Sequence, residues 1–180
     1  MSDAPDERTL GMPCSRTRPI AIVLLLLMIG CKHENVSDPT DELLLELAQR
    51  TGGATWFNES DTLLPRTGGS GHAQPLLRTR YNTIASTALT DEGRVVADTI
   101  FPTGSVIVKE LWENPSVLSL YALMYKKPDH PYADTDGWVW GYVQPDGTVV
   151  QPASDKGSAC RGCHSGAGHI DLTRMNIAYP

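Results

Sequence analysis

"SVIVKEL", residues 105–111, opens the part of the sequence that decides the fold. It is followed by "SLYALMYKK", residues 119–127, and by "GWVWGYVQ", residues 137–144. All three are runs of β-branched or aromatic residues between turn-forming residues, which is the pattern of β-strands. The stretch "QPDGT", residues 144–148, predicts a tight turn into a further strand at Val149 and Val150. We therefore expect an antiparallel sheet built from consecutive strands.

Two segments before these strands carry helical signals. Asp38 is a good N-cap, Pro39 suits the first helical position, and Gly52 follows where the helix would end. The apolar residues on one face of this first helix are Leu43, Leu44, Leu47 and Ala48. A second helical pattern is carried by Tyr81, Ile84, Ala85, Ala88 and Leu89. The expected fold class is α+β, a mostly antiparallel β-sheet with short flanking helices.

The composition sets outer bounds on function. With 180 residues the chain is long enough for one domain with a sizeable core. The formal net charge of −6 argues against nucleic acid as a partner. An acidic chain is also a poor ligand for a membrane surface, so attachment to a membrane must come from a dedicated segment.

Such a segment stands near the N-terminus. An unbroken apolar run covers residues 20–29, about half the length of a membrane-spanning helix, and Arg16 and Arg18 precede it. The run ends in "MIGC", residues 28–31, which resembles a bacterial lipobox, whose cysteine receives lipid and becomes the new N-terminus. We expect residues 1–30 to be a lipoprotein signal peptide and Cys31 to be lipidated. The alternatives are a buried core strand or an uncleaved anchor.

The residues that precede this run fit a signal peptide poorly. Asp3, Asp6 and Glu7 are acidic, whereas the region before the apolar run should be net positive. Met12 offers a cleaner start, because two arginines and no acid lie between it and the apolar run. We therefore expect translation to begin at Met12.

The motif "CRGCH", residues 160–164, predicts a covalently bound haem. C-x-x-C-H is the attachment site of c-type haem, with Cys160 and Cys163 forming thioethers and His164 binding iron as the proximal ligand. Cys14 would leave with the signal peptide and Cys31 would carry lipid, so no cysteine remains to pair with these two. The alternatives are a disulfide within the pair, or a zinc site that adds His169; the adjacency of Cys163 and His164 is awkward for one zinc ion.

Four stretches in order resemble the cytochrome P-460 and cytochrome c′-beta family. They are "FPTGSVIVKE" (residues 101–110), "ALMYKK" (122–127), "GWVWGYV" (137–143) and "CRGCH" (160–164). The resemblance implies a mostly β haem domain, usually a homodimer, with five-coordinate iron. It also implies nitric-oxide binding, or hydroxylamine oxidation in members whose haem is cross-linked to a lysine. We assign residues 31–75 to a tether, short helix and loop, and residues 76–180 to a haem c domain with a C-terminal haem-binding segment.

Strand alternation nominates a lysine for the open side of the iron. Ile107, Lys109 and Leu111 share one face of their strand, and Glu110 lies on the other. If the first face meets the haem, Lys109 reaches the porphyrin, where burial would lower its pKa and leave a nucleophilic amine. The alternative is that Lys109 extends from a sheet edge into solvent. Lys126 and Lys127 are further candidates for a cross-link.

Other side chains near these motifs are weaker candidates. In "WVWGYV", residues 138–143, the small face with Gly141 is expected to accept the flat ring, and the aromatic face to be core or dimer contact. The candidate distal ligands are Met124, Met175, His72 and His130. The candidates for contacting the haem propionates or orienting His164 are His169, Asp171, Arg174, Arg78 and Arg80, although surface roles are commoner for such residues.

The sequence thus predicts an exported, lipid-anchored haem c protein in a bacterial cell envelope, facing the periplasm. Its open iron would bind or oxidise a small nitrogen compound such as nitric oxide or hydroxylamine. The alternative is a six-coordinate cytochrome that only carries electrons. The expected partners are the small nitrogen compound, a soluble electron carrier, the membrane through the lipid, and a second copy of the chain.

Overall fold

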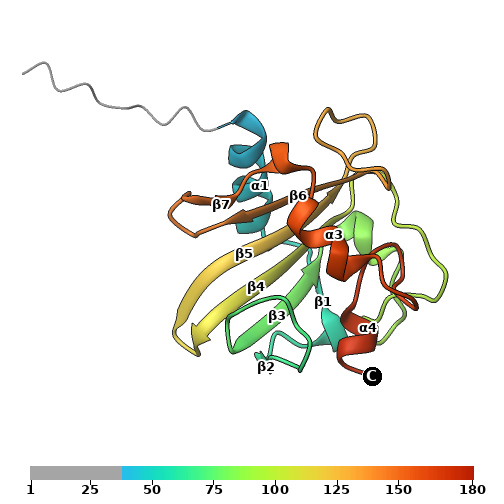
Figure 1. Ribbon diagram of the computed structural model, residues 1–180. Helices are drawn as coiled ribbons and strands as arrows, with labels where there is room; N and C mark the ends of the chain where they lie inside the picture. The colour runs from blue at the N-terminus through green and yellow to red at the C-terminus, as the bar shows by residue number, and fades with distance from the viewer. Residues whose placement is uncertain (1–37) are drawn as a thin grey trace, which may run out of the picture. The chain divides into compact units, whose positions relative to one another are not determined.

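The computed structural model describes residues 38–180, so the expected signal peptide, the start at Met12 and the lipidated Cys31 lie outside the described residues. A seven-stranded antiparallel sheet forms the centre of this part of the chain (Figure 1). The strands are β1 (Thr55–Trp56), β2 (Leu64–Pro65), β3 (Leu76–Tyr81), β4 (Val106–Asn114), β5 (Val117–Lys126), β6 (Trp138–Val143) and β7 (Val149–Gln151). The helices are α1 (Pro39–Gln49), α2 (Thr83–Ser86), α3 (Ser158–His164) and α4 (Met175–Ala178), with 3-10 turns at Phe57–Glu59 and Ala153–Asp155.

From β3 to β7, consecutive strands are neighbours in the sheet. The order is β1-β3-β4-β5-β6-β7, and β2 pairs with another part of β3. The three strand-forming stretches predicted from the sequence become β4, β5 and β6, and the turn at residues 144–148 leads into β7 as expected. The α+β prediction is confirmed.

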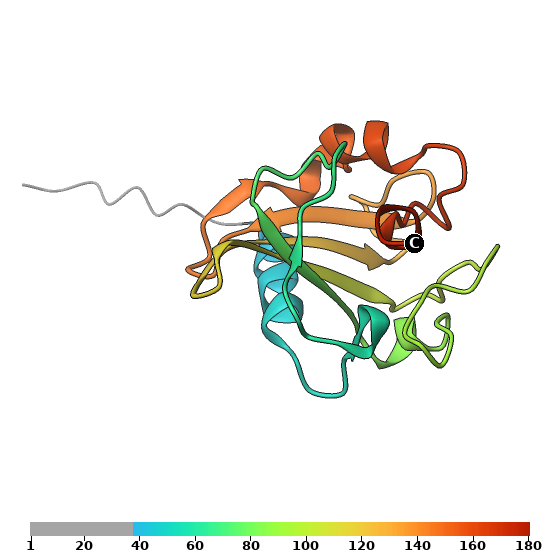
Figure 2. The same ribbon diagram turned by 90° about the horizontal axis from the view of Figure 1, so that it is seen from below.

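Different helices cover the two faces of the sheet. Helix α1 lies on one face, and α3 and α4 lie on the other (Figure 2). The α1 face is lined mainly by aliphatic residues, among them Val106, Val108, Leu123, Val139 and Val143. The α3 face is lined by larger side chains, among them Tyr81, Ile107, Met124, Trp138 and Trp140. Among residues 38–180, no helix is both long and apolar enough to cross a bilayer.

Helix α1 begins where the sequence predicts. The Asp38 side chain accepts a hydrogen bond from the backbone N–H of Thr40 at 2.8 Å, which satisfies one of the free donors at the helix start. Leu44 and Ala48 are fully buried against the sheet. Burying a leucine side chain contributes about 1.5–3 kcal/mol, so this docking ties residues 39–49 to the same compact unit as the strands.

Gly141 explains how closely α1 approaches. A Cβ atom at this position would lie 2.5 Å from Cδ1 of Leu44, so any larger residue would have to displace the buried Leu44 side chain. The prediction that the small face of β6 accepts the flat ring is therefore wrong: α1 already fills it. The aromatic face, with Trp138, Trp140 and Tyr142, faces the α3 side instead.

The second predicted helix is shorter than expected. Tyr81 ends β3, where it pairs with Ile107 of β4, and only Thr83–Ser86 forms helix α2. Asn82 marks the change, because its side chain accepts hydrogen bonds from the N–H groups of Ala85 (2.8 Å) and Val106 (3.0 Å). Pairing with β4 therefore takes Tyr81 out of the predicted helix, which is confirmed only over one turn at residues 83–86.

Candidate functional site

Two rows of side chains across the sheet form the floor of a pocket. Thr79, Lys109, Ala122 and Tyr142 are successive partners across β3, β4, β5 and β6. The next row of the same face is Tyr81, Ile107, Met124 and Trp140. All eight line one pocket, whose empty space, counted together with its opening to solvent, is about 450 Å³.

Helix α3 brings the C-x-x-C-H motif to this pocket. Residues three and four apart lie on the same side of a helix, so Cys160, Cys163 and His164 project together. Cys160 is buried in the pocket wall, and burial raises the pKa of its thiol to about 11. Cys163 is exposed and lines an adjoining hollow of about 550 Å³, beside Gly71. Both cysteines are free thiols.

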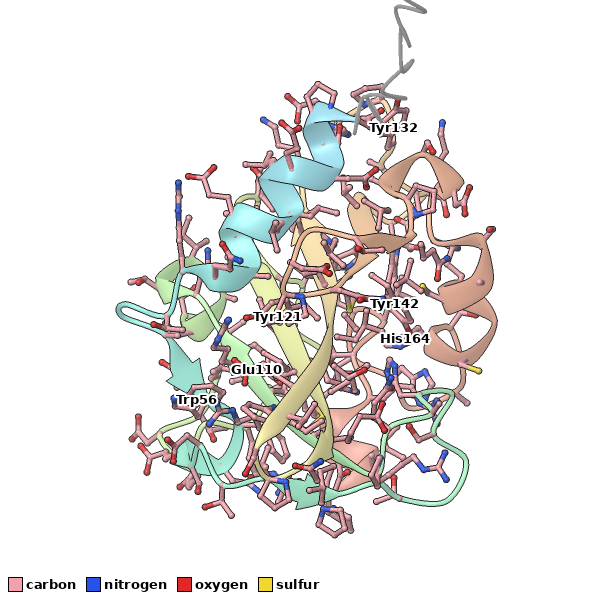
Figure 3. The ribbon with its side chains drawn as sticks, turned by 90° about the vertical axis from the view of Figure 1, so that its left-hand side faces the viewer. Trp56, Glu110, Tyr121, Tyr132, Tyr142 and His164 are labelled. Atoms are coloured by element: carbon pink, nitrogen blue, oxygen red, sulfur yellow. The ribbon has the colours of Figure 1, made fainter. Side chains whose placement is uncertain are left out.

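His164 is oriented as a metal ligand would be. Its Nδ1 lies 2.7 Å from the backbone carbonyl oxygen of Leu172. A carbonyl can only accept, so Nδ1 carries the proton and Nε2 keeps its lone pair. Burial lowers the pKa of His164 to about 4, so the ring is neutral at physiological pH. The edge of Trp140 meets this ring at a centroid distance of 5.1 Å, and Figure 3 shows His164 with Tyr142 on the α3 side of the sheet.

An acidic loop between β5 and β6 anchors α3. Arg161, between the two cysteines, donates to Asp134 at 2.5 Å and to Asp136 at 2.7 Å. Asp134 also accepts hydrogen bonds from the Trp140 indole at 2.8 Å and from the Trp138 backbone N–H at 2.9 Å. One carboxylate therefore holds the motif helix to the aromatic strand that lines the pocket.

Two cations face the pocket. Lys109 lies in its floor, and burial together with the nearby Arg174 guanidinium lowers the pKa of Lys109 to about 8. The Lys109 side chain is surrounded by protein atoms but is only partly buried, because part of it borders the pocket. Arg174 lines the same pocket, and within residues 38–180 its buried Nε has no hydrogen-bond partner. None of the described residues that line the pocket is acidic, so a bound anionic group would be favoured.

The three lysines that are candidates for a cross-link have different surroundings in the structure. Lys109 lines the pocket as expected for the face it shares with Ile107. Lys126 instead forms a buried ion pair with Asp171, and Lys127 forms an exposed one with Asp129. Of the lysines in the described part of the chain, Lys109 alone borders the pocket.

His72 enters the pocket from the loop before β3. Its Nδ1 lies 3.1 Å from the Tyr142 hydroxyl, and burial lowers the pKa of His72 to about 3, so this imidazole is neutral. His130 lies outside the pocket and accepts a hydrogen bond from the backbone N–H of Tyr132. His72 thus remains a candidate near a ligand, whereas His130 does not.

The candidate methionines lie at the pocket, whereas two of the candidate arginines lie on the other face of the sheet. Met124 and Met175 both line the pocket, and the Thr79 hydroxyl donates to the Met175 sulfur at 3.3 Å. Arg78 and Arg80 lie on the opposite face, where both pair with Glu110, at 2.6 and 3.4 Å. The prediction that these arginines meet the haem propionates is therefore wrong; Figure 3 shows Glu110 away from His164, on the α1 side.

The zinc alternative finds no support in the geometry. Across residues 38–180, no three histidine, cysteine or acidic side chains come together as a metal cluster. His169 turns back on its own loop, where its Nδ1 lies 2.8 Å from the His164 carbonyl oxygen.

The residues present fit a c-type haem. The thiols and the imidazole share one side of α3, the pocket is mostly apolar, and its unpartnered Arg174 Nε suits an acidic group such as a propionate. The neutral His164 ring uses Nδ1 for the Leu172 carbonyl and so leaves Nε2 for iron. The donor set and the charge of the pocket thus match the cofactor that the motif predicts.

Sequence reasoning missed two parts of this site. It assigned Trp140 and Tyr142 to core or dimer contacts, and it made no use of the loop with Thr67, Ser70 and Gly71 that lines the hollow beside Cys163. The register offers the missing signal for the aromatic strand: Tyr142 lies two strands from Lys109 in the same row, through Ala122. That pairing requires knowledge of the strand order.

Comparison with protein families identifies the region. A family model described as cytochrome P460 matches residues 78–173, more than half of the chain. The match runs from β3 through α3 to the turn whose Leu172 carbonyl accepts the hydrogen bond from His164. No curated protein and no solved structure matches the chain.

Proposed function

Because the chain belongs to the cytochrome P460 family, a family of c-type haem proteins, we propose that Cys160 and Cys163 hold the haem and His164 ligates its iron. The observation that carries this proposal is the 2.7 Å contact between His164 Nδ1 and the Leu172 carbonyl. It fixes the tautomer that leaves Nε2 available to a metal. Arg174 is the residue that would bind a propionate, since its buried Nε is otherwise unpartnered.

We further propose that the protein binds or oxidises a small nitrogen compound, nitric oxide or hydroxylamine. Once bound, the haem would supply iron with an open coordination position. Ile107, Trp140 and other large side chains give the pocket a mostly apolar lining. Lys109, with a pKa of about 8, can hold or release a proton at Nζ close to neutral pH.

An electron carrier remains the second candidate, because two methionines line the pocket. A thioether from Met124 or Met175 would close the sixth position. The hydroxyl of Thr79 already donates to the Met175 sulfur, which argues against that residue as a ligand. Met124 is therefore the residue on which this alternative rests.

The spectrum of the purified protein separates the two functions. We expect covalently bound haem whose ferrous form is high-spin and binds carbon monoxide and nitric oxide, in the wild type and in Met124→Leu alike. A ferrous low-spin spectrum that carbon monoxide leaves unchanged, and that becomes high-spin in Met124→Leu, would establish the carrier instead.

Lys109 separates ligand binding from oxidation. If it is bonded to the porphyrin, the haem-bearing peptide will include the mass of the segment around residue 109, and Lys109→Ala will lose hydroxylamine oxidation. Coincident spectra and peptide masses in the wild type and Lys109→Ala would leave simple gas binding, the outcome we favour, because nearness of a lysine is not sufficient for the bond.

We also propose that the protein is a lipoprotein on the periplasmic side of a bacterial membrane and works as a homodimer with a soluble electron carrier. The support is the sequence of residues 16–31 and the resemblance described above. Several acyl chains, each contributing about 0.8 kcal/mol per buried methylene, would anchor Cys31 durably. Mass spectrometry of the mature N-terminal peptide decides it: an unmodified Cys31 refutes the anchor.

A further inference from the structure

The turn after α3 carries the carbonyl that holds His164. Ile170 and Thr173 pair across this turn, with the Thr173 N–H donating to the Ile170 carbonyl at 2.8 Å. The two central residues, Asp171 and Leu172, have φ angles of 43° and 66°. Consecutive positive φ angles are typical of a type I′ turn, which favours asparagine, aspartate and glycine. Leucine rarely adopts this conformation, so the turn needs support from its surroundings.

Asp171 supplies that support. Lys126 Nζ lies 2.9 Å from both carboxylate oxygens, and the Trp138 indole donates to Oδ1 at 3.2 Å. The backbone N–H of Phe101 donates to Oδ2 at 2.9 Å. The side chains of Lys126 and Asp171 are 6% and 8% exposed, so the pair is shielded from water. The turn is thereby fixed to β5, β6 and the segment before β4.

We propose that the ion pair between Lys126 and Asp171 positions His164 as an iron ligand. The pair holds the turn, the turn holds the Leu172 carbonyl, and the carbonyl accepts the Nδ1 proton. A hydrogen bond at Nδ1 raises the basicity of the other ring nitrogen. Lys126 and Asp171 are thus positioning residues; this role rests on the proposed ligation by His164.

Two variants of the haem-loaded protein test the proposal. In Lys126→Met and Asp171→Asn we expect a lower iron–histidine stretching frequency, read by resonance Raman spectroscopy of the ferrous form. We also expect a higher reduction potential in both, because a weaker imidazole donor stabilises ferric iron less. Loss of charge alone would move the potential in opposite directions, since one variant loses a positive charge and the other a negative one.

Matched controls sharpen the result. Lys126→Arg keeps the charge and should keep the wild-type frequency, and Lys127→Met, which breaks the exposed pair with Asp129, should leave it unchanged. Wild-type frequencies and potentials in both test variants, or an equal shift in Lys127→Met, would overturn the proposal. If Lys126→Met does not fold, the iron–histidine frequency of Asp171→Asn decides, because this variant keeps the side-chain shape and an acceptor for Trp138.

The same spectra separate this inference from its premise. A wild-type ferrous form that is five-coordinate and high-spin yet has no iron–histidine band refutes ligation by His164, and with it the positioning role; if the ferrous form is low-spin, the reduction potentials of the variants decide. A normal wild-type band that neither variant shifts refutes only the positioning role.

Discussion

Replacing Asp134 by alanine should loosen the haem-bearing helix. The Asp134 carboxylate is 2% exposed and accepts from the Arg161 guanidinium, the Trp140 indole and two backbone N–H groups, those of Asp136 and Trp138. Without it, the Trp140 indole N–H and the Trp138 N–H lose their acceptor inside the protein, since both residues are at most 2% exposed. A buried donor left without a partner costs about 1–3 kcal/mol, so the two together cost about 2–6 kcal/mol.

Asp136→Ala is the matched control. Asp136 also accepts from Arg161, at 2.7 Å, but its side chain is 44% exposed. An exposed ion pair contributes about 0–1 kcal/mol, so this variant should stay close to the wild type. Urea unfolding of the haem-loaded proteins, followed by tryptophan fluorescence and by haem absorbance, gives both values. Equal losses below about 1 kcal/mol in the two variants would refute the assignment of Asp134 as the anchor of α3.

Three further variants address other parts of the structure. Gly141→Val should destabilise the protein by about 1–3 kcal/mol in urea unfolding, because a Cβ there meets the buried Leu44, and the double variant with Leu44→Ala should lose less than the sum of the two single losses; additive losses would contradict the clash. Burial raises the pKa of Asp41 above 3.8, so the folded chain binds more protons than the unfolded chain just above that pH, and stability falls as pH rises through this window. Asp41→Asn removes this dependence, so its stability relative to the wild type should increase as the pH rises above 3.8 in urea titrations, whereas a constant difference would contradict it. Arg174→Leu removes a positive charge from the pocket and should lower the haem reduction potential in a redox titration, because ferric iron is then less disfavoured; an unchanged potential would place Arg174 away from the haem.

The sequence predicts the sheet well because its signals are local. Runs such as residues 105–111 carry their own strand propensity, and the cap at Asp38 needs only its neighbours. Tyr81 shows the limit: its helical spacing is real, but pairing with Ile107 decides its conformation. Propensity is a weak prior once a partner strand is present.

The haem-binding residues could be predicted because they belong to one short motif. The spacing of Cys160, Cys163 and His164 already implies a shared helix side, and alternation along β4 places Lys109 on the face opposite Glu110. The sequence of β6 does not show which of its two faces lines the pocket. The answer depends on where α1 docks, and α1 docks where Leu44 fits against Gly141. The roles of Asp134 and Asp171 required contacts between segments far apart in the chain.

The placement of all seven strands before α3 bears on how this protein matures. Strands β1 to β7 lie between residues 55 and 151, and the central ones are joined as successive hairpins, so the sheet can form early from contacts close in sequence. The segment from α3 to α4 adds no strand to that sheet and meets it through side chains. A chain whose sheet is complete while the segment from α3 to α4 is still undocked presents both thiols of the C-x-x-C-H motif for haem attachment. Docking of the segment from α3 to α4 onto the sheet would then bury the attached haem, so that covalent attachment precedes the last step of folding.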